Sequence, residues 1–484
     1  MHSYAVLTLL ALVGAGPDVP SIPVLTFCPQ MSDTFTEVMI SLKTEDPKKR
    51  DVVYMIDWGD GTPPVVTNQT RSGDQVYNYH TYKKVGAMPL RVKATSVGGD
   101  PAGSEWSRPC TLAVLPSLAK WVFPVPAGMF CTPALDPSGN LYFGDEVGTF
   151  YSLAPDGKLR WRFSVPSSLE VDETGRTDTV YGAISGAAAL GDNAVYFPCE
   201  DRHLYALTMD GKLLWSYKTA TPVVAAPAIG GDGTVYCADD SGLVYCLNSQ
   251  GILKWTFLTH DEVDNGLTIG PNGTIYVPSD SLYALSPAGK ELWAQGAQEE
   301  DNPFFGCAIG PEGDIYAGNM DGYLYRLEPK AGRIVWRTPT EDEDEIHCEP
   351  VFGPDNTVYF GSDDYYVSAK PPSGPARTFF EAEDRIRATL AVNSKGSVYV
   401  HAQDGTVYCL TPGGKVKWQK QIGSGDFDWI PASPVIAPDG TVYVGSFQDA
   451  LFAFQGDGAP LADKWSMQRG TARHTGRAVK SGKQ

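Results

Sequence analysis

The sequence lacks the short motifs that mark most catalytic and metal sites. None of its nine Cys residues forms a C-x-x-C pair, and its seven His residues occur singly, with no H-x-H or H-E-x-x-H spacing. It has no G-x-S-x-G segment, and its Gly-rich stretches are typical of hairpin turns rather than of phosphate loops. We therefore nominate no catalytic residue, and the sequence favours a protein that is not an enzyme.

Basic residues are scarce as well. Lys and Arg number 38 against 57 Asp and Glu, which gives a formal net charge of −19. Because affinity for nucleic acid depends on clustered Lys and Arg, nucleic acid is excluded as a partner. The chain also has no run of about 18 apolar residues after its N-terminal segment, so we expect no transmembrane span in the mature chain.

The N-terminal segment is similar to a signal peptide. Its apolar core is Tyr4–Val13, followed by the small residues Gly14, Ala15 and Gly16, although no Lys or Arg precedes that core. We expect residues 1–21 to be a signal peptide and linker. The mature protein would then be secreted, periplasmic or located at the cell surface.

Glycine, proline and tyrosine are abundant, with 51, 37 and 24 residues, which suits many short strands joined by tight turns. A strand-like segment centred on Tyr occurs eight times, at Tyr142, Tyr196, Tyr236, Tyr276, Tyr316, Tyr359, Tyr399 and Tyr443. Each copy follows a turn such as Pro271-Asn272-Gly273 and precedes a second strand, a Gly turn and an aromatic residue. These closing aromatics lie 38 to 54 residues apart, at Trp161, Trp215, Trp255, Trp293, Trp336, Phe380, Trp418 and Trp465.

This period is typical of the blades of a β-propeller. One four-stranded unit of about 40 residues cannot bury both of its faces alone, whereas eight units in a ring cover each other. We therefore predict an all-β protein whose residues 117–484 form an eight-bladed β-propeller with a C-terminal tail. The leading segment Lys120–Phe123 should complete the last blade and close the ring.

Residues 22–116 are predicted to form a separate β-sandwich of immunoglobulin-like size. The segment Asp57–Thr62 (DWGDGT), the later His80-Thr81-Tyr82 and Gly86, and the alternating Leu90–Ala94 resemble the polycystic-kidney-disease (PKD) domain. Cys28 and Cys110 lie near the two ends of this segment. An oxidising compartment would permit a disulfide between them if they lie close enough in space.

The propeller units resemble the pyrroloquinoline-quinone-like (PQQ-like) repeat, most clearly at Asp156–Trp161 (DGKLRW) and Asp210–Trp215 (DGKLLW). The tail, Trp465–Arg469 and Ala472–Arg477, resembles a segment common in exported bacterial proteins with such repeats. The resemblance implies one of two activities. Quinone-dependent dehydrogenases of this fold hold the quinone against a Trp and a calcium ion, commonly beside adjacent cysteines, whereas the propeller subunit of the outer-membrane protein assembly machine binds other proteins. The chain has no adjacent Cys pair, which argues against bound pyrroloquinoline quinone.

Acidic residues concentrate in the segments expected to connect successive blades. One such segment is the run Glu341, Asp342, Glu343, Asp344 and Glu345. In a propeller these connections share a face with the turns after the Tyr strands, which contain Asp145, Asp201, Asp239, Asp321, Asp363, Asp404 and Asp449. The opposite face should carry Lys158, Lys212, Lys290, Lys330 and Lys415. The acidic face either serves solubility or binds a basic partner surface or a cation, for which calcium is the best match to carboxylate ligands.

The residues that recur in every blade are interpreted as packing residues, so a site should consist of residues that do not recur. Where the chain enters successive blades it offers such polar or aromatic residues, Asn265, His347, Glu349, Arg387 and Trp429, which we predict to line the channel mouth. The leading hypothesis is an exported binding or scaffold protein whose partner is a protein or a cell-surface glycan, with no required cofactor. The alternatives are a quinone- and calcium-dependent dehydrogenase and a carbohydrate-binding or carbohydrate-processing protein.

Overall fold

The computed structural model describes residues 19–28, 31–33, 37–115, 118–166, 168–171, 177–180, 182–297, 302–423, 430–447, 450–462 and 464–477. Its regular elements are all β-strands. The chain divides into two compact units, residues 1–119 and 120–484. Across the part of the chain that the model describes, no helix has the length and apolar character needed to cross a membrane.

The N-terminal unit consists of two sheets. One has the order β1 (Val24–Phe27), β3 (Glu37–Lys43) and β6 (Val76–Thr81). The other has the order β2 (Met31–Asp33), β8 (Cys110–Leu115), β7 (Gly86–Ser96), β4 (Val52–Asp57) and β5 (Val65–Val66). Alternate residues of β3, β4 and β7, including Ile40, Tyr54 and Val92, form one shared core, as expected for strands with one buried face.

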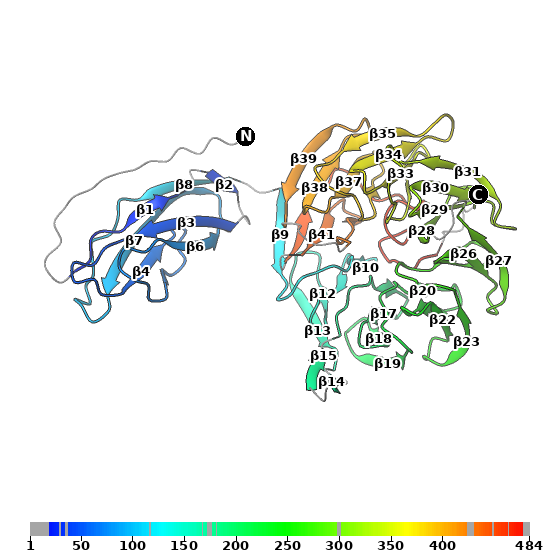
Figure 1. The fold of residues 1–484 in the computed structure, drawn as a ribbon, viewed down its shortest axis with the longest axis horizontal. Coiled ribbons are helices and arrows are strands. Elements are labelled where there is room, and N and C mark those ends of the chain that lie inside the picture. Colours follow the sequence, from blue (N-terminus) through cyan, green and yellow to red (C-terminus); the bar gives the residue numbers. More distant parts are fainter. Residues whose placement is uncertain are drawn as a thin grey trace. The chain divides into compact units, whose positions relative to one another are not determined.

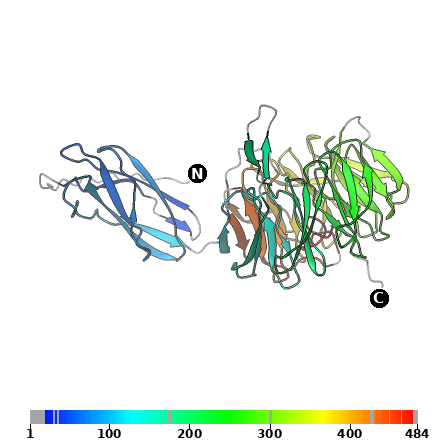
Figure 2. The ribbon, with the colours of Figure 1, turned by 90° about the horizontal axis from the view of Figure 1, so that it is seen from below.

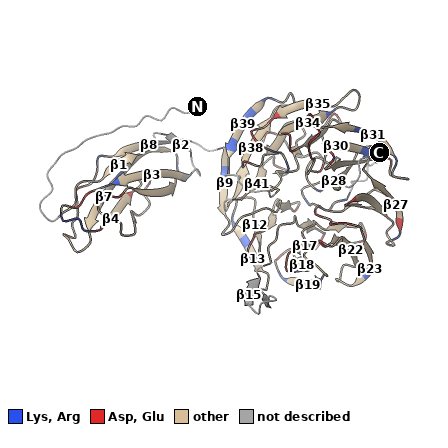
Figure 3. Ribbon diagram, viewed as in Figure 1, with Lys and Arg blue, Asp and Glu red and all other residues tan. Residues whose placement is uncertain are grey.

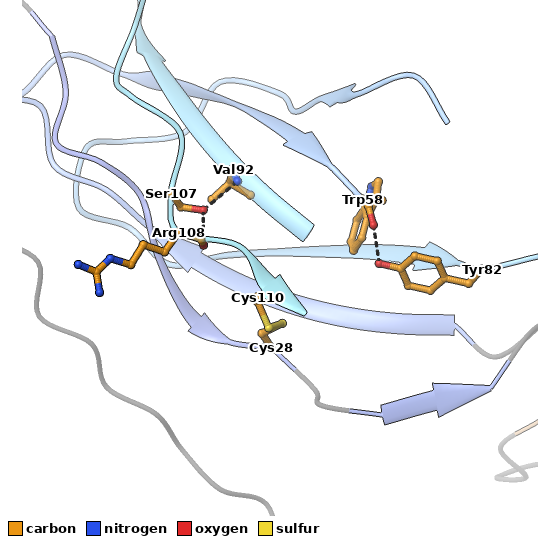
Figure 4. Close-up of a disulfide and its surroundings, with 7 residues drawn as sticks. All are labelled: Cys28, Trp58, Tyr82, Val92, Ser107, Arg108 and Cys110. Carbon is orange, nitrogen blue, oxygen red and sulfur yellow. Dashed lines mark hydrogen bonds between the residues drawn. A yellow bond between two sulfur atoms is a disulfide. The ribbon is translucent and has the colours of Figure 1, made fainter. Parts of the chain in front are cut away.

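The DWGDGT and HTY segments of this unit contact each other through their side chains. Trp58 stacks on His80 with ring centroids 4.7 Å apart. The hydroxyl of Tyr82 donates a hydrogen bond to the Trp58 carbonyl, 3.0 Å (Figure 4). Asp60 lies 2.8 Å from His80 Nε2 and accepts a hydrogen bond from the backbone N–H of Thr62. These two segments therefore pack together as one local unit.

Cys28 and Cys110 form a disulfide, which confirms that the two residues are close in space (Figure 4). Their Cα atoms are 6.7 Å apart, within the range that a disulfide spans. Cys28 follows β1 and Cys110 begins β8, so the bond links the two sheets of the unit.

The second unit contains eight four-stranded sheets in the described residues, which we number I to VIII along the chain. Figure 1 shows them arranged around a common centre, with β10, β20 and β28 near the centre and β13, β23 and β31 at the rim. Sheets I to III are β10 (Ala134–Leu135), β11 (Leu141–Gly144), β12 (Thr149–Leu153) and β13 (Leu159–Ser164); β16 (Ala189–Leu190), β17 (Ala194–Cys199), β18 (His203–Thr208) and β19 (Leu213–Lys218); and β20 (Ala228–Ile229), β21 (Val235–Ala238), β22 (Leu243–Leu247) and β23 (Leu253–Leu258).

Sheets IV and V are β24 (Thr268–Ile269), β25 (Ile275–Pro278), β26 (Ser281–Leu285) and β27 (Glu291–Gly296); and β28 (Phe304–Ile309), β29 (Ile315–Asn319), β30 (Tyr323–Leu327) and β31 (Ile334–Pro339). Sheets VI and VII are β32 (Val351–Phe352), β33 (Val358–Gly361), β34 (Tyr366–Lys370) and β35 (Arg377–Glu381); and β36 (Ala391–Val392), β37 (Val398–His401), β38 (Thr406–Leu410) and β39 (Val416–Gln421). A further hairpin, β14 (Ser168–Val171) and β15 (Thr177–Val180), projects from one side of the sheets (Figure 2).

Sheet VIII consists of β40 (Val435–Ile436), β41 (Val442–Ser446), β42 (Ala450–Phe454) and the N-terminal strand β9 (Ala119–Pro124). The expectation that the leading strand completes the last sheet is thereby confirmed. The closing aromatic of this sheet is Trp121 of β9, whose ring lies 5.6 Å from that of Tyr443, much as Trp161 lies 5.9 Å from Tyr142 in sheet I. The assignment of Trp465 to this position was wrong, because Trp465 lies beyond β42 in the C-terminal tail.

A second aromatic was also misassigned. In sheet VI the residue that packs on Tyr359 is Phe379, with ring centroids 5.0 Å apart. Phe380, the predicted closing aromatic, contacts Tyr408 of sheet VII instead, also at 5.0 Å. The pairing of β34 with β35 has a register irregularity between Val367 and Ser368, which shifts the aromatic positions relative to the other sheets.

The repeated Gly-Lys turn and the closing Trp join neighbouring sheets. Trp161 of sheet I donates a hydrogen bond from its indole N–H to the carbonyl of Met209 in the last turn of sheet II, 3.0 Å. A Cβ atom on Gly211 of that turn would lie 2.6 Å from the Trp161 ring, and its φ is +81°. Only glycine satisfies both conditions, which explains why the turn and the Trp recur together.

Candidate functional site

A pocket of about 570 Å³ lies where the chain enters the inner strands of the second unit. Each of the eight sheets contributes at least one lining residue from the segment that leads into its inner strand or, in sheet V, from the inner strand itself. The wall includes Phe130, Thr132, Ser185, Val224, Asn265, Phe305, His347, Arg387, Thr389, Pro431 and Ser433. Gln468 of the tail also lines the pocket.

Three of the five residues predicted for the channel mouth line this pocket: Asn265, His347 and Arg387. Their segments lead into the inner strands of sheets IV, VI and VII, so the repeat brings them together from distant parts of the chain. Trp429 lies outside the described residues. Glu349 does not line the pocket, and its actual role is described below.

One side of the pocket carries four carboxylates, Glu200, Asp240, Glu262 and Asp264. Burial, together with the charges of Asp264 and Glu262, raises the pKa of Asp240 to about 6. The Oδ1 atom of Asp240 is buried and has no hydrogen-bond partner among the described residues. This side therefore holds unbalanced negative charge in a partly dehydrated setting, which favours contact with a positive group.

The other side of the pocket carries His347 and Arg387, whose partners lie just behind them. Arg387 Nη2 donates to Asp363 Oδ2 at 2.6 Å, and His347 Nε2 lies 2.7 Å from Glu345 Oε2. Ligand atoms of Glu345, His347 and Asp363 lie within 4.8 Å of one another, close enough to surround a metal ion. They do not fit one in this arrangement, because Arg387 already neutralises Asp363 and occupies its oxygens.

Glu349 is an anchor for the C-terminal tail, by which we mean residues 464–477, and its prediction as a channel-mouth ligand was not met. It is fully buried, and its Oε2 accepts hydrogen bonds from Trp465 Nε1 and from the backbone N–H of Arg469, both 2.9 Å. Burial raises the pKa of Glu349, and the charge of the buried Arg469 opposes that shift. Glu349 is only two residues beyond His347, but it contacts the C-terminal tail and does not line the pocket.

The tail runs along the inner strands of the second unit. Its carbonyls accept backbone hydrogen bonds of 2.6 to 3.0 Å from six inner strands, donated by Phe352, Val392, Leu135, Leu190, Ile229 and Ile269. Arg469 fits between two glycines, since a Cβ on Gly266 or on Gly476 would lie 2.1 Å from its guanidinium. Because Gln468 reaches the pocket from this tail, the tail forms the pocket floor.

The acidic run Glu341–Glu345 lies in the connection between β31 and β32, and its first four residues are exposed. The Asp residues of the turns after the Tyr strands are different. Asp145, Asp239 and Asp321 are buried and accept hydrogen bonds from the hydroxyls of Tyr151, Tyr245 and Tyr325. These three Asp side chains stabilise their turns through hydrogen bonds and add little exposed negative charge to this face. Asp449, another of the acidic positions predicted in these turns, lies outside the described residues.

Lys and Arg lie on several outer strands, including β9, β13 and β39 (Figure 3). Sequence reasoning missed three residues that line the pocket: Phe130 and Phe305, which belong to no motif, and Gln468, which lies in the Trp465–Arg469 segment. Besides the resemblance noted above, the glycines at 470 and 476 are a signal for the tail, because each leaves space for a neighbouring Trp465 or Arg469 side chain.

Comparisons with known proteins identify the repeat. A family model described as outer membrane protein assembly factor BamB matches residues 154–280 and 278–466. BamB from Moraxella catarrhalis is 16% identical, with a TM-score of 0.56 over 70% of this chain and 99% of its own. Saccharomyces cerevisiae Sqt1 is 12% identical, with a TM-score of 0.56 over 70% of this chain and 98% of its own.

The computationally designed protein Ika8 is 16% identical, with a TM-score of 0.54 over 69% of this chain and 97% of its own. No curated protein sequence matches the chain. At these identities the structures support the fold alone, which is a β-propeller of PQQ-like repeats. Because the family model covers more than half of the residues, the chain belongs to the BamB family of outer membrane protein assembly factors.

Proposed function

We propose that this protein is an exported, non-catalytic scaffold whose closed eight-bladed propeller binds another protein through the face that holds the pocket. The observation that carries the proposal is the convergence of loops from all eight sheets on one pocket with an acidic wall. The pocket suits binding better than catalysis, because its His347 and Arg387 side chains are already held by Glu345 and Asp363. Membership of the BamB family supports a protein partner.

The chemistry of the cysteines supports export. A disulfide joins Cys28 to Cys110, and disulfides persist in oxidising compartments. The seven other cysteines are buried, and burial raises the pKa of thiols such as Cys131 and Cys307 to about 12, which keeps them as unreactive thiols. The contacts of Trp58, His80 and Tyr82 support a PKD-type sandwich that spaces or targets the propeller.

Site-specific photo-crosslinking in the producing cells tests the binding face. A photoreactive phenylalanine analogue replaces Tyr365, which is 42% exposed in the turn after β33 on the pocket side. The matched control replaces Ile252, 63% exposed in the turn between β22 and β23 on the opposite side. We expect a discrete protein adduct from position 365 only. Equal adducts from both positions, or none from position 365, would overturn the proposed face.

A calorimetric titration tests the absence of cofactor chemistry. The full protein is titrated with calcium and then with pyrroloquinoline quinone in the presence of calcium. We expect no saturable quinone binding, because Arg387 and Asp363 form an ion pair where a cation would sit. Saturable heat near one quinone per chain would replace the scaffold proposal with a dehydrogenase.

A further inference from the structure

A second cavity, of about 780 Å³, lies at the opposite end of the inner strands from the pocket. Its walls are the turn after β20, the turn after β24 and the C-terminal tail. The turns contribute Gly230, Gly231, Gly270 and Gly273, with Asp232, Pro271 and Asn272 between them. We call it the tail cavity. Its volume lies within the range of small-molecule sites, roughly 300–1,000 Å³.

The tail places its side chains alternately toward and away from this cavity. Ile229 and Ile269 donate backbone hydrogen bonds to the carbonyls of Thr475 and Gly476, 3.0 and 2.6 Å, so the tail lies against the inner strands here. The N–H of His474 bonds back to the Thr471 carbonyl at 2.8 Å, and His474 and Gly476 have positive φ, +50° and +59°, so the tail turns within this segment. The cavity is lined by Thr471, Arg473, Thr475 and Arg477, whereas His474 and Gly476 are buried.

The two guanidinium groups retain unused hydrogen-bond donors. Arg473 Nη2 bonds to the Gly191 carbonyl and to Asp192 Oδ1 at 3.1 Å, but its buried Nε has no partner among the described residues. Arg477 is exposed and lies over Gly231, where a Cβ would approach its Nη1 to 3.1 Å. No hydrogen bond or ion pair links Arg477 to any other described side chain.

Among the described residues that line the cavity there is one carboxylate, and it is already engaged. Asp232 accepts hydrogen bonds from the backbone N–H of Thr234, 3.0 Å, and from its hydroxyl, 2.8 Å. These bonds lower the pKa of Asp232 and turn its oxygens toward its own turn. The cavity is therefore lined by two positively charged guanidinium groups and by glycine-rich turns, although the net charge of the chain is −19.

We infer that the tail cavity binds a small oxyanion, a carboxylate or a phosphate, through Arg473 and Arg477. A planar guanidinium donates two parallel hydrogen bonds to such a group, and charge-assisted bonds of this kind are about twice as strong as neutral ones. The glycine turns lack side chains that would keep a ligand from the backbone. This site is independent of the proposed protein-binding face.

Isothermal titration of the full protein with succinate and, separately, with inorganic phosphate at low salt tests the inference. We expect saturable binding of at least one ligand and about tenfold weaker binding by Arg477→Gln, since one charge-assisted hydrogen bond accounts for that factor. Arg477→Lys keeps the charge but loses the fork and should bind with intermediate affinity. Binding of succinate alone assigns a carboxylate, and binding of phosphate alone assigns a tetrahedral anion.

Two further variants control for folding and for general charge. Arg333→Gln removes an exposed arginine from the turn between β30 and β31, on the same side as the cavity, and should bind as the wild type does. Asp192→Asn removes the counter-charge of Arg473 and should strengthen binding several-fold, which misfolding cannot produce. No saturable heat from either ligand, or equal affinities in wild type and Arg477→Gln, would overturn the inference.

Discussion

Replacement of Arg469 by Met tests whether the electrostatic attraction between two buried charges, Arg469 and Glu349, holds the tail in place. Arg469 is fully buried, donates from its backbone N–H to Glu349, and donates from Nη2 to the Pro227 carbonyl at 3.1 Å. Arg469→Met fills a similar volume but leaves the Glu349 carboxylate buried without its counter-charge. Removing one of two interacting buried charges leaves the other uncompensated, which costs up to about 3–5 kcal/mol of folding free energy.

The matched double variant, Glu349→Gln with Arg469→Met, removes both charges and keeps an acceptor for the Trp465 indole. Replacing both members of a buried pair is often close to neutral. We therefore expect the double variant to be more stable than Arg469→Met, with a coupling free energy of about 2 kcal/mol or more. Urea unfolding followed by tryptophan fluorescence measures this, since nine of the 11 Trp residues lie in residues 120–484.

The pH dependence gives a second readout. Burial raises the pKa of Glu349 in the folded state. Glu349 therefore destabilises the folded state only at pH values at which this side chain would be ionised in the unfolded chain. The deficit of Arg469→Met should be largest at pH 7 and should shrink as the pH falls toward the ordinary pKa of 4.5. A deficit under about 1 kcal/mol at pH 7, or strictly additive effects in the double variant, would refute the argument.

Three other variants address the turns, the pocket and the N-terminal unit. Gly211→Ala, at φ +81° with Trp161 2.6 Å from a Cβ, should lose about 2 kcal/mol or more in urea unfolding, whereas Gly374→Ala, at φ +92° with open space around it, should lose only about 1 kcal/mol. Asp240→Asn should raise the melting temperature above pH 6. The raised pKa of about 6 means that ionised Asp240 destabilises the folded state; this penalty is full above pH 6, declines between pH 6 and 4, and is absent below about pH 4. A gain in melting temperature that persists at pH 3 would contradict this. Asp60→Asn should cost about 2 kcal/mol at pH 7: despite burial, bonds from Thr62 and His80 lower the pKa of Asp60 to about 2, so calorimetry should find the difference lost as the pH falls from 4 to 2.

The repeat was predictable because local packing enforces it. A Tyr in the second strand, a closing Trp and a Gly in the next turn contact one another in successive sheets, as Tyr196, Trp215 and Gly251 do. The same regularity misled the assignment of Trp465, whose distance from Trp418 suits a closing aromatic although its indole bonds to Glu349. Spacing alone cannot distinguish an aromatic on a strand from one that anchors a tail.

The pocket was partly predictable for a related reason. Asn265, His347 and Arg387 lie three or four residues before the inner strands of their repeats, and a ring of repeats brings such segments together. Phe130 and Phe305 could not be chosen, because nothing in their local sequence separates them from other core aromatics. Gln468 reaches the pocket only because the tail follows six inner strands, which depends on contacts between residues far apart in the chain.

The position of β9 in sheet VIII sets the order in which this protein can fold during synthesis. About 330 residues separate β9 from its partner β42. At roughly 5–20 residues per second, the ribosome needs about 15–70 s to supply that partner. Throughout this interval β9 carries Trp121, Val122 and Phe123 on a strand with no hydrogen-bonded neighbour, which is the kind of edge that promotes aggregation. Until its last sheet has been made, the growing chain therefore exposes a strand that the finished protein pairs with β42.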